Sequence, residues 1–336
     1  MPKSNLPNPH LMALISIFVA QLIWAAANSV IKLTLQELPP FTFLFLRFWI
    51  TSTVVLPYVI LQLKKINVDR RDYLNIFLLG IFAQAAIIFV FLGLKYTTAL
   101  DSAIIGILGP ILAMFAGHYF YKEKIHPSVK LGVLIATIGT AIVVFEPAFS
   151  QVPTTNGIPT HLRIMGNLFI VLYDLCFVLY IIWSKISLGQ TNNIIKKTLH
   201  FIHLKPMKKD YPSNLLMSLT FFVGMVTMAP FAILENFGVF GKVNYSILNL
   251  SSTTVAGLLY MVFFSSIVAY FLFESALKKA KVVETALLSY LSPLMAMPFA
   301  FLLLNEIPSK VAIIGAVIIA LGIVFAESKP QHKPLI

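Results

Sequence analysis

Two residues of opposite charge lie deep inside long apolar stretches of this chain. Arg47 follows Pro40 by seven residues, and Asp174 lies near the middle of residues 164–184. A charged side chain in hydrocarbon is costly, so both should face a helix-bundle interior or a water-filled cavity. A guanidinium group binds a carboxylate through paired hydrogen bonds, and a carboxylate binds an ammonium group. The two residues suit either a structural ion pair or a site for a zwitterionic molecule.

Further polar and aromatic residues lie in the same apolar stretches. Amide side chains could orient a bound molecule, and Tyr and Trp combine an apolar ring with a polar tip. Any one of these aromatic residues, taken alone, is more commonly a packing residue. The predicted binding residues are Gln21, Trp24, Asn28, Arg47, Gln84, Tyr173, Asp174, Tyr270 and Tyr290.

Bond-making chemistry is not indicated. His118 is isolated near a helix end, and the other histidines lie in tails or loops. Cys176 is the only cysteine, so the chain forms no internal disulfide and no thiolate metal site. No spacing of His, Cys, Asp and Glu suits a metal, no glycine-rich phosphate loop is present, and no serine has a triad partner. We therefore expect no catalytic residue, metal or cofactor, and the chain is not predicted to be an enzyme.

Two prolines interrupt two of the apolar stretches. Each lies about ten residues from the start of its stretch, which at a rise of about 1.5 Å per residue is near the middle of a membrane. Pro110 and Pro293 each free the carbonyl group four residues earlier, at Gly106 and Ser289. A freed carbonyl group in hydrocarbon is tolerated only beside protein or a water-filled cavity. The pair predicts two kinked helices that line a central cavity; kinks that only shape the packing are the alternative.

A long stretch of the chain occurs twice. Residues 94–142 match residues 277–325 at a constant displacement of 183 positions. The matched landmarks are Pro110, Glu123, Gly132 and Gly139 with Pro293, Glu306, Gly315 and Gly322. A weaker match earlier in each copy, at a displacement of 153, pairs Lys32 with Lys185 and Gln21 with Asp174. Duplicated apolar units are typical of membrane carriers that bind a solute between two halves.

The repeated glycines and carboxylates indicate structural roles. The two glycines of each copy are seven residues apart, so they lie on one helix face and permit close packing. Four carboxylates precede or begin helices, where they can accept hydrogen bonds from free N–H groups. These predicted structural or gate residues are Asp101, Glu123, Glu284 and Glu306.

The composition is that of a membrane protein. The chain has 336 residues, of which 58% are hydrophobic and 11% charged, and its mean hydropathy is +0.87. A water-soluble domain of this length needs more charge to cover its surface. The stretches long enough to cross a membrane as helices are 10–31, 40–62, 73–93, 100–120, 128–146, 164–184, 213–234, 252–273, 283–304 and 309–326. The first also resembles a signal peptide, but its removal would leave the first repeat one helix short, so we retain it.

Basic residues indicate the orientation. With a cytoplasmic N-terminus, 19 of the 25 Lys and Arg residues lie on the cytoplasmic side, five lie opposite, and Arg47 lies inside a span. Both termini are therefore predicted to be cytoplasmic, and the scattered charge argues against nucleic-acid binding. Five helices per repeat are an odd number, so the second repeat enters the membrane inverted. The basic loop 185–212 fits either a segment on the inner leaflet or a solvated linker.

We predict an all-α integral membrane protein with ten transmembrane helices in two inverted five-helix repeats. The repeats span residues 1–148 and 164–328, joined by an extracytoplasmic linker at 149–163 and followed by a cytoplasmic tail at 329–336. The expected partners are a small-molecule solute and the lipid bilayer, with no nucleic acid.

The duplicated segment also carries a family resemblance. Residues 94–123 read LKYTTALDSAIIGILGPILAMFAGHYFYKE, and residues 277–306 read LKKAKVVETALLSYLSPLMAMPFAFLLLNE. Each contains a proline-centred helix and a terminal Glu, and each precedes a helix with two glycines. This pattern resembles the EamA family of the drug/metabolite transporter superfamily over nearly the whole chain. The departures are Lys122 and Asn305, where a Gly is frequent in the family, and the long basic loop.

The resemblance implies two inverted five-helix halves, helices four and nine beside a central pathway, and alternating access, commonly for export of amino acids or other metabolites. A phosphorylated sugar or a nucleotide sugar would need several cations, and the spans offer only Arg47, whereas a zwitterion could use Arg47 and Asp174. We expect a carrier in a bacterial-type inner membrane that exports an amino acid or related zwitterion. The alternatives are a phosphorylated-sugar or nucleotide-sugar carrier that uses Lys32 and Lys95, a membrane scaffold and an integral membrane enzyme.

Overall fold

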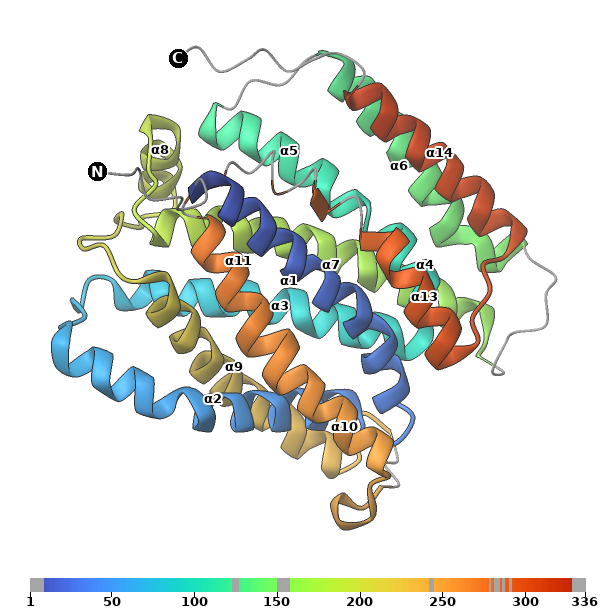
Figure 1. Ribbon diagram of the computed structural model, residues 1–336, viewed down its shortest axis with the longest axis horizontal. Coiled ribbons are helices and arrows are strands. Elements are labelled where there is room, and N and C mark those ends of the chain that lie inside the picture. The colour runs from blue at the N-terminus through green and yellow to red at the C-terminus, as the bar shows by residue number, and fades with distance from the viewer. Residues whose placement is uncertain are drawn as a thin grey trace, which may run out of the picture.

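The computed structural model is built from helices. It describes residues 9–122, 127–149, 158–241, 245–277, 279–280, 285, 288–289 and 292–327. The helices are α1 (Pro9–Thr34), α2 (Pro40–Lys65), α3 (Tyr73–Tyr96), α4 (Ala99–Ile105), α5 (Leu108–Tyr121), α6 (Pro127–Phe149), α7 (Thr160–Ser187), α8 (Asn193–Phe201), α9 (Ser213–Asn236), η1 (Ile247–Asn249), α10 (Ser252–Tyr260), η2 (Met261–Val268), α11 (Ala269–Leu277), α13 (Ser292–Leu304) and α14 (Lys310–Glu327) (Figure 1). No strand occurs in the described ranges, and the predicted all-α class is confirmed.

Helix length and composition are those of a multi-pass membrane protein. Seven helical segments of the described chain are long and apolar enough to cross a membrane: His10–Thr34, Pro40–Lys65, Tyr73–Tyr96, Ala99–Tyr121, Thr160–Ser187, Ser213–Asn236 and Ser252–Leu277. Shorter apolar helices lie at Leu134–Ala148, Met295–Leu304 and Lys310–Gly322. The predicted spans overlap these ten segments, but three are shorter than a full crossing, so ten crossings stay a prediction.

The segment Ala99–Tyr121 is broken in its middle. α4 ends at Ile105 and α5 begins at Leu108. Pro110 has no N–H for the carbonyl group of Gly106, which instead accepts from the N–H of Gly109 at 3.3 Å. The break predicted from this proline is therefore present.

The segment Ser252–Leu277 changes its helical geometry without a break. α10 and α11 are joined by η2, which is a π-helix. The hydroxyl of Ser266 donates to the carbonyl oxygen of Met261 at 2.8 Å within these widened turns. Such turns are frequent at functional sites, and η2 contributes to the cavity wall described below.

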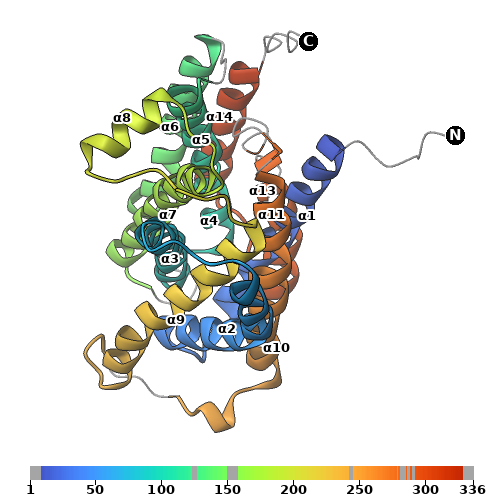
Figure 2. The same ribbon diagram turned by 90° about the vertical axis from the view of Figure 1, so that its left-hand side faces the viewer.

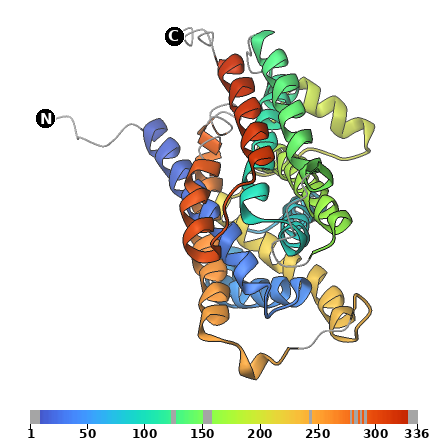
Figure 3. The same cartoon turned by 90° about the vertical axis from the view of Figure 1, so that its right-hand side faces the viewer.

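The helices form two groups, with one tightly packed pair at each edge. α6 packs along α14, and α2 packs along α9, at opposite edges of the molecule (Figure 1, Figure 2). Between these edges, α1 packs against α10–α11 and α13, while α7 packs against α3 and α4–α5. Figure 3 shows these two groups facing each other.

Glycines bring α6 and α14 into close contact. A methyl group placed on Gly139 would lie 2.8 Å from the carbonyl oxygen of Gly315, and one on Gly322 would lie 2.5 Å from that of Gly132. Both separations are well below the 3.5–4.0 Å, roughly, at which nonbonded heavy atoms attract. The close backbone approach predicted for these glycines is confirmed.

Two lysines, the half-buried Lys32 and the buried Lys185, stabilise equivalent helix ends. Each ammonium group donates to two carbonyl oxygens at the end of a neighbouring helix: one lies in the last turn, and the other lies just after it. The bonds run from Lys32 Nζ to Leu94 at 3.3 Å and to Thr97, and from Lys185 Nζ to Leu277 at 3.3 Å and to Ala280 at 2.9 Å. These are the residue pairs that the displacements of 153 and 183 relate.

The basic loop is folded onto the rest of the protein. Helix α8 within it buries Ile195 and Leu199, while its two lysines stay exposed. Further along, the carboxylate of Asp72 accepts from the N–H of Lys208 and from the hydroxyl of Tyr211, both at 2.8 Å. The loop is therefore held by specific bonds, which an unstructured linker lacks; its contact with lipid stays a prediction.

Candidate functional site

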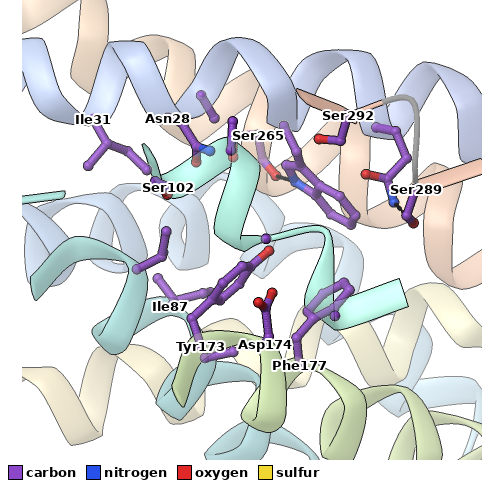
Figure 4. A pocket seen from close by; sticks show the side chains of 18 of the residues that line it. Asn28, Ile31, Ile87, Ser102, Tyr173, Asp174, Phe177, Ser265, Ser289 and Ser292 are labelled. Carbon is purple, nitrogen blue, oxygen red and sulfur yellow. Dashed lines mark hydrogen bonds between the residues drawn. The ribbon is translucent and has the colours of Figure 1, made fainter. Parts of the chain in front are cut away.

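A cavity of about 110 Å³ lies between the two helix groups, next to the break between α4 and α5. α1, α2, η2 and α11 supply one wall, and α3, α4–α5 and α7 supply the other. Figure 4 shows Tyr173 and Asp174 pointing from α7 toward the break, with Asn28 on the opposite side. A single water molecule needs roughly 10–15 Å³ on the same measure, so the cavity has room for a larger guest.

Most of the predicted binding residues meet at this cavity, although they come from distant parts of the chain. Seven of the nine line it, together with three of the four residues assigned to the proline kinks. These residues are Gln21, Trp24, Asn28, Arg47, Tyr173, Asp174, Tyr270, Gly106, Pro110 and Ser289.

Gln84 is placed elsewhere. Its amide Nε2 donates to the carbonyl oxygen of Thr220 at 3.2 Å, and the side chain lies against Gly224 of α9. Gln84 therefore does not line this cavity, because its side chain faces a helix contact. Tyr290, Glu123, Glu284 and the side chain of Pro293 lie outside the described residues.

Arg47 is held by serines instead of a carboxylate. Its Nε donates to Ser266 Oγ at 2.7 Å, and one terminal nitrogen donates to Ser265 Oγ at 3.4 Å. The guanidinium carbon lies 5.5 Å from the centre of the Phe48 ring. Among the described residues no carboxylate is within ion-pair distance of Arg47, so the proposed structural pair with Asp174 is not formed. A guanidinium group that is 2% exposed is thus left without an anionic partner from the described chain.

Asp174 occupies the space beside the helix break. Its carboxyl group lies directly against Gly109, because a methyl group on Gly109 would lie 2.8 Å from Oδ1. Its other oxygen, Oδ2, is buried and has no hydrogen-bond partner in the described part of the chain. A buried unpaired oxygen costs stability, so this atom is available to a bound molecule with a suitable donor.

Aromatic rings close one end of the cavity. The Trp24 ring lies 5.0 Å from Tyr270 and 6.0 Å from Phe177 between centroids, in edge-to-face arrangements. Its Nε1 donates to the carbonyl oxygen of Ser265 at 3.1 Å, which fixes the ring orientation. Rings held in this way present a rigid apolar surface, and their faces attract cations.

Small hydroxyl residues complete the cavity, and the sequence interpretation missed them. Gln21 Nε2 donates to Ser289 Oγ at 2.7 Å, which joins the two halves of the chain at one edge of the cavity (Figure 4). The missed lining residues with hydroxyl groups are Ser102, Ser265, Thr285 and Ser292. Serine and threonine are common in transmembrane helices, so they carry little signal; the adjacent serines in an apolar span were the one available sign.

Ionised side chains gather at one end of α4 and differ from the predicted helix caps. Asp101 pairs with Arg163 at 3.2 Å, and Arg163 also pairs with Glu146 at 3.1 Å. The cap of α4 is the hydroxyl of Thr98, which accepts from the N–H of Asp101 at 2.9 Å. The expectation that Asp101 itself accepts these N–H groups is therefore corrected.

Glu306 also caps a different helix from the one expected. Its carboxylate accepts from the N–H of Leu100 at 3.1 Å, so it caps α4 and not α14, which follows it in the chain. Burial raises the pKa of Glu306, while the nearby ammonium group of Lys32 acts in the opposite direction. Within the described ranges no three His, Cys, Asp or Glu side chains are close enough to hold a metal ion.

Sequence comparison assigns this architecture to a family. The EamA-like transporter family model matches residues 11–145 and again residues 198–327. The chain belongs to the EamA-like transporter family. This EamA-like protein is accordingly a multi-pass membrane transporter, as the resemblance in its duplicated segment implied.

Relatives of this EamA-like transporter span its whole length. An uncharacterized transporter of Archaeoglobus fulgidus is 25% identical over 317 residues, covering 94% of this chain and 96% of its own. A protein of Escherichia coli K12 named "Probable amino-acid metabolite efflux pump" is 22% identical over 303 residues, covering 90% of each chain. A solved crystal structure aligns with a TM-score of 0.59 at 17% identity, covering 94% of this chain and 97% of the other, and supports the fold alone.

Proposed function

We propose that this chain is a secondary carrier that exports a small zwitterionic metabolite, with an amino acid as the first candidate, by alternating access. The observation that carries the proposal is the cavity itself. It combines a guanidinium group, a carboxyl oxygen without a partner in the described chain, and a wall of aromatic rings. Both charged groups of a zwitterion therefore find a complement in one cavity.

Each charged group of the cavity has bonding capacity left for a solute. A guanidinium group has about five N–H donors, and the serines of η2 engage two nitrogens of Arg47, so further donors remain for a carboxylate. Asp174 Oδ2 can accept from an ammonium group, and the rings of Trp24 and Tyr173 can stack on the same cation.

A phosphorylated sugar is less well served by the same structure. That alternative relied on Lys32 and Lys95 as additional cations. Lys32 is engaged by two carbonyl oxygens, and Lys95 is exposed, with its Nζ 5.3 Å from the centre of the Tyr96 ring. Neither lysine lines the cavity, which leaves Arg47 to face a phosphate with a charge near −2.

The topology of the carrier is part of the proposal. We infer ten crossings in two inverted halves, residues 1–148 and 164–328, with both termini cytoplasmic in a bacterial-type inner membrane. Support comes from two separate matches to the family model and from the equivalent bonds of Lys32 and Lys185. The first helix of each half, α1 or α7, packs mainly against helices of the other half, which also fits two related halves. Residues 149–163 would then form the extracytoplasmic linker and residues 329–336 the cytoplasmic tail.

Counterflow in proteoliposomes tests the proposed function. Vesicles loaded with unlabelled solute are given the labelled solute outside, with amino acids, purine metabolites and phosphorylated sugars offered in parallel. We expect saturable exchange of an amino acid, and loss of exchange in Arg47→Ala and in Asp174→Asn. Gln84→Leu is the matched control, because Gln84 is buried and polar but faces α9, and its exchange should be unchanged.

Each other outcome contradicts a defined part of the proposal. Exchange limited to phosphorylated solutes would keep the carrier and overturn the zwitterion. Unchanged exchange in both cavity variants would overturn the site. No exchange by folded protein would favour a scaffold, and product formation in intact and leaky vesicles alike would indicate an enzyme.

A further inference from the structure

A carboxyl group outside the cavity is buried among donors and is unused by the proposed solute site. Glu274 lies in α11, is 1% exposed, and does not line the cavity. The hydroxyl groups of Tyr180 and Ser184 bind its two carboxyl oxygens, the latter at 2.7 Å. Both partners come from α7, so the carboxyl group lies between two spanning helices.

No described cation neutralises this carboxyl group. Lys185, which follows Ser184 in α7, directs its ammonium group to the carbonyl oxygens of Leu277 and Ala280. Among described residues no Lys or Arg is within ion-pair distance of Glu274. A charge on Glu274 would thus be held by hydrogen bonds alone in a low-dielectric region, which is costly.

The other helices packed against α11 add little charge near Glu274. α9 carries Glu235 at its far end, where Glu235 binds Thr42 of α2. α1 carries His10 and Lys32 at its two ends, and η2 carries no titratable group. The remaining titratable neighbours are Tyr180 and Tyr270, which is itself close to Arg47 as well as to Glu274.

The related half of the chain has no polar group at the equivalent positions. The displacement of 183 relates Glu274 to Phe91, and the displacement of 153 relates Tyr180 to Ala27 and Ser184 to Ile31. All three counterparts are apolar and at most 3% exposed. Apolar side chains therefore fill the equivalent place in the first half of the chain. Helix packing alone does not require a carboxyl group with two hydroxyl partners there.

Glu274 is also close to the solute cavity through two tyrosines. Tyr180, which binds its carboxyl group, lies 6.1 Å from Tyr270 between ring centroids. Tyr270 lines the cavity and packs against Trp24. A phenol can both donate and accept a hydrogen bond. When water enters the cavity, the two tyrosine hydroxyl groups can therefore pass a proton between the cavity and Glu274.

We propose that Glu274 binds and releases one proton in each transport cycle, so that solute movement is coupled to proton movement across the membrane. In the step, a hydronium ion in the cavity gives up a proton and becomes water. The hydroxyl groups of Tyr270 and Tyr180, with water between them, pass a proton on, and the Glu274 carboxylate becomes a neutral carboxyl group. After the cavity opens to the other side, water takes the proton back. This inference rests on the transport function proposed above.

The test compares solute exchange with proton movement in the same proteoliposomes. Counterflow is measured at equal pH on both sides, and solute-dependent proton flux is followed with a pH-sensitive dye trapped inside vesicles without a pH gradient. The unmodified chain should show both. Glu274→Gln, which keeps hydrogen bonds to Tyr180 and Ser184, should retain counterflow and lose the solute-dependent proton flux. Glu235→Gln replaces another buried carboxyl group in a span and should retain both.

The outcomes separate this inference from the proposed function. Counterflow without proton flux in the unmodified chain would overturn the coupling and leave the carrier intact. Proton flux that persists in Glu274→Gln would also overturn the role of Glu274. The absence of counterflow for every solute would overturn both proposals. As a second variant, Tyr180→Phe keeps the carboxyl group, so it should slow the proton flux without abolishing it.

Discussion

At the scale of single residues, a missing side chain shapes the cavity as much as the side chains present. Gly109 lies beside Asp174 at the break between α4 and α5, where it has no side chain to fill the space next to the carboxyl group. Any other residue would place a carbon atom in the space that the carboxyl group occupies. The position of the carboxyl group is therefore set jointly by the glycine and by the break.

Gly109→Ala tests this dependence. The added methyl group would lie 2.8 Å from Oδ1, so the Asp174 carboxyl group must move while the helix backbone can stay. We expect the half-saturation concentration in counterflow to rise about tenfold, which corresponds to about 1.4 kcal/mol. The melting temperature should change little. An unchanged half-saturation concentration would show that Asp174 has no contact with the solute.

Residue types were readable from the sequence, but their partners were not. Burial of Arg47 and Asp174 followed from the cost of charge in hydrocarbon, and both line the cavity. The serines that bind Arg47 depend on the register of a π-helix, which no residue pattern in that stretch marks. Gln84 lies outside the cavity, because a buried amide that bonds at a helix contact has the same sequence appearance as a solute ligand.

At the scale of helices, the break at Gly106 separates two halves of one span. α4 is buried along its whole length, whereas α5 ends with an exposed Tyr119. The proline that makes the break also removes a hydrogen bond from the helix. Stability is thereby lost at the place where the carrier needs a cavity wall.

Pro110→Ala should restore the missing N–H and favour a continuous helix. An interior proline costs up to about 3 kcal/mol relative to alanine, so we expect a higher melting temperature together with slower counterflow. Pro57→Ala is the matched control, because Pro57 lies inside α2 and faces outward. It should leave counterflow unchanged. Equal counterflow in both variants would indicate that the break only shapes packing.

The contact between the basic loop and the α2–α3 connection should depend on pH. The ammonium group of Lys208, 2.6 Å away, and the N–H of Arg71 lower the pKa of the Asp69 carboxyl group. A pKa lowered by folding means that the contact stabilises the loop above the ordinary aspartate pKa and is lost as pH falls through the lowered value.

Hydrogen exchange measures this contact. Corrected for intrinsic rates, the N–H groups of residues 205–211 should exchange faster at pH 3 than at pH 7. The difference should shrink in Asp69→Asn and in Lys208→Ala, which remove the same bond from either side. The effect is small, because the Lys208 side chain is 55% exposed. An identical pH response in Asp69→Asn would refute the assignment.

At the scale of the whole molecule, the two halves meet through glycine contacts and a side-chain hydrogen bond. The glycine contacts of α6 and α14 form one edge, and the bond from Gln21 to Ser289 lies at the edge of the cavity. The glycine contacts followed from the repeat, because matched glycines seven residues apart leave few other roles. The cavity bond did not, since Ser289 entered the sequence interpretation only as the carbonyl freed by a proline.

Gly139→Leu should separate α6 from α14. The first carbon of the new side chain would lie 2.8 Å from a carbonyl oxygen and 2.9 Å from a backbone nitrogen, so the backbones must move apart. We expect a loss of about 1–3 kcal/mol, seen as a lower melting temperature in detergent. Ile138→Leu changes the neighbouring residue, which is 52% exposed, and should have no effect. A stable Gly139→Leu protein would mean that the two helices can slide without cost.

The bond that orients Trp24 gives this transporter an optical reporter of its own. The chain has three tryptophans; Trp49 is 51% exposed, and Trp183 donates to the carbonyl oxygen of Asn75. Of the three, Trp24 alone lines the cavity. Replacing the other two with phenylalanine would leave a single emitter whose wavelength and quenching follow what enters beside it. Occupancy could then be titrated by fluorescence without a label on either molecule.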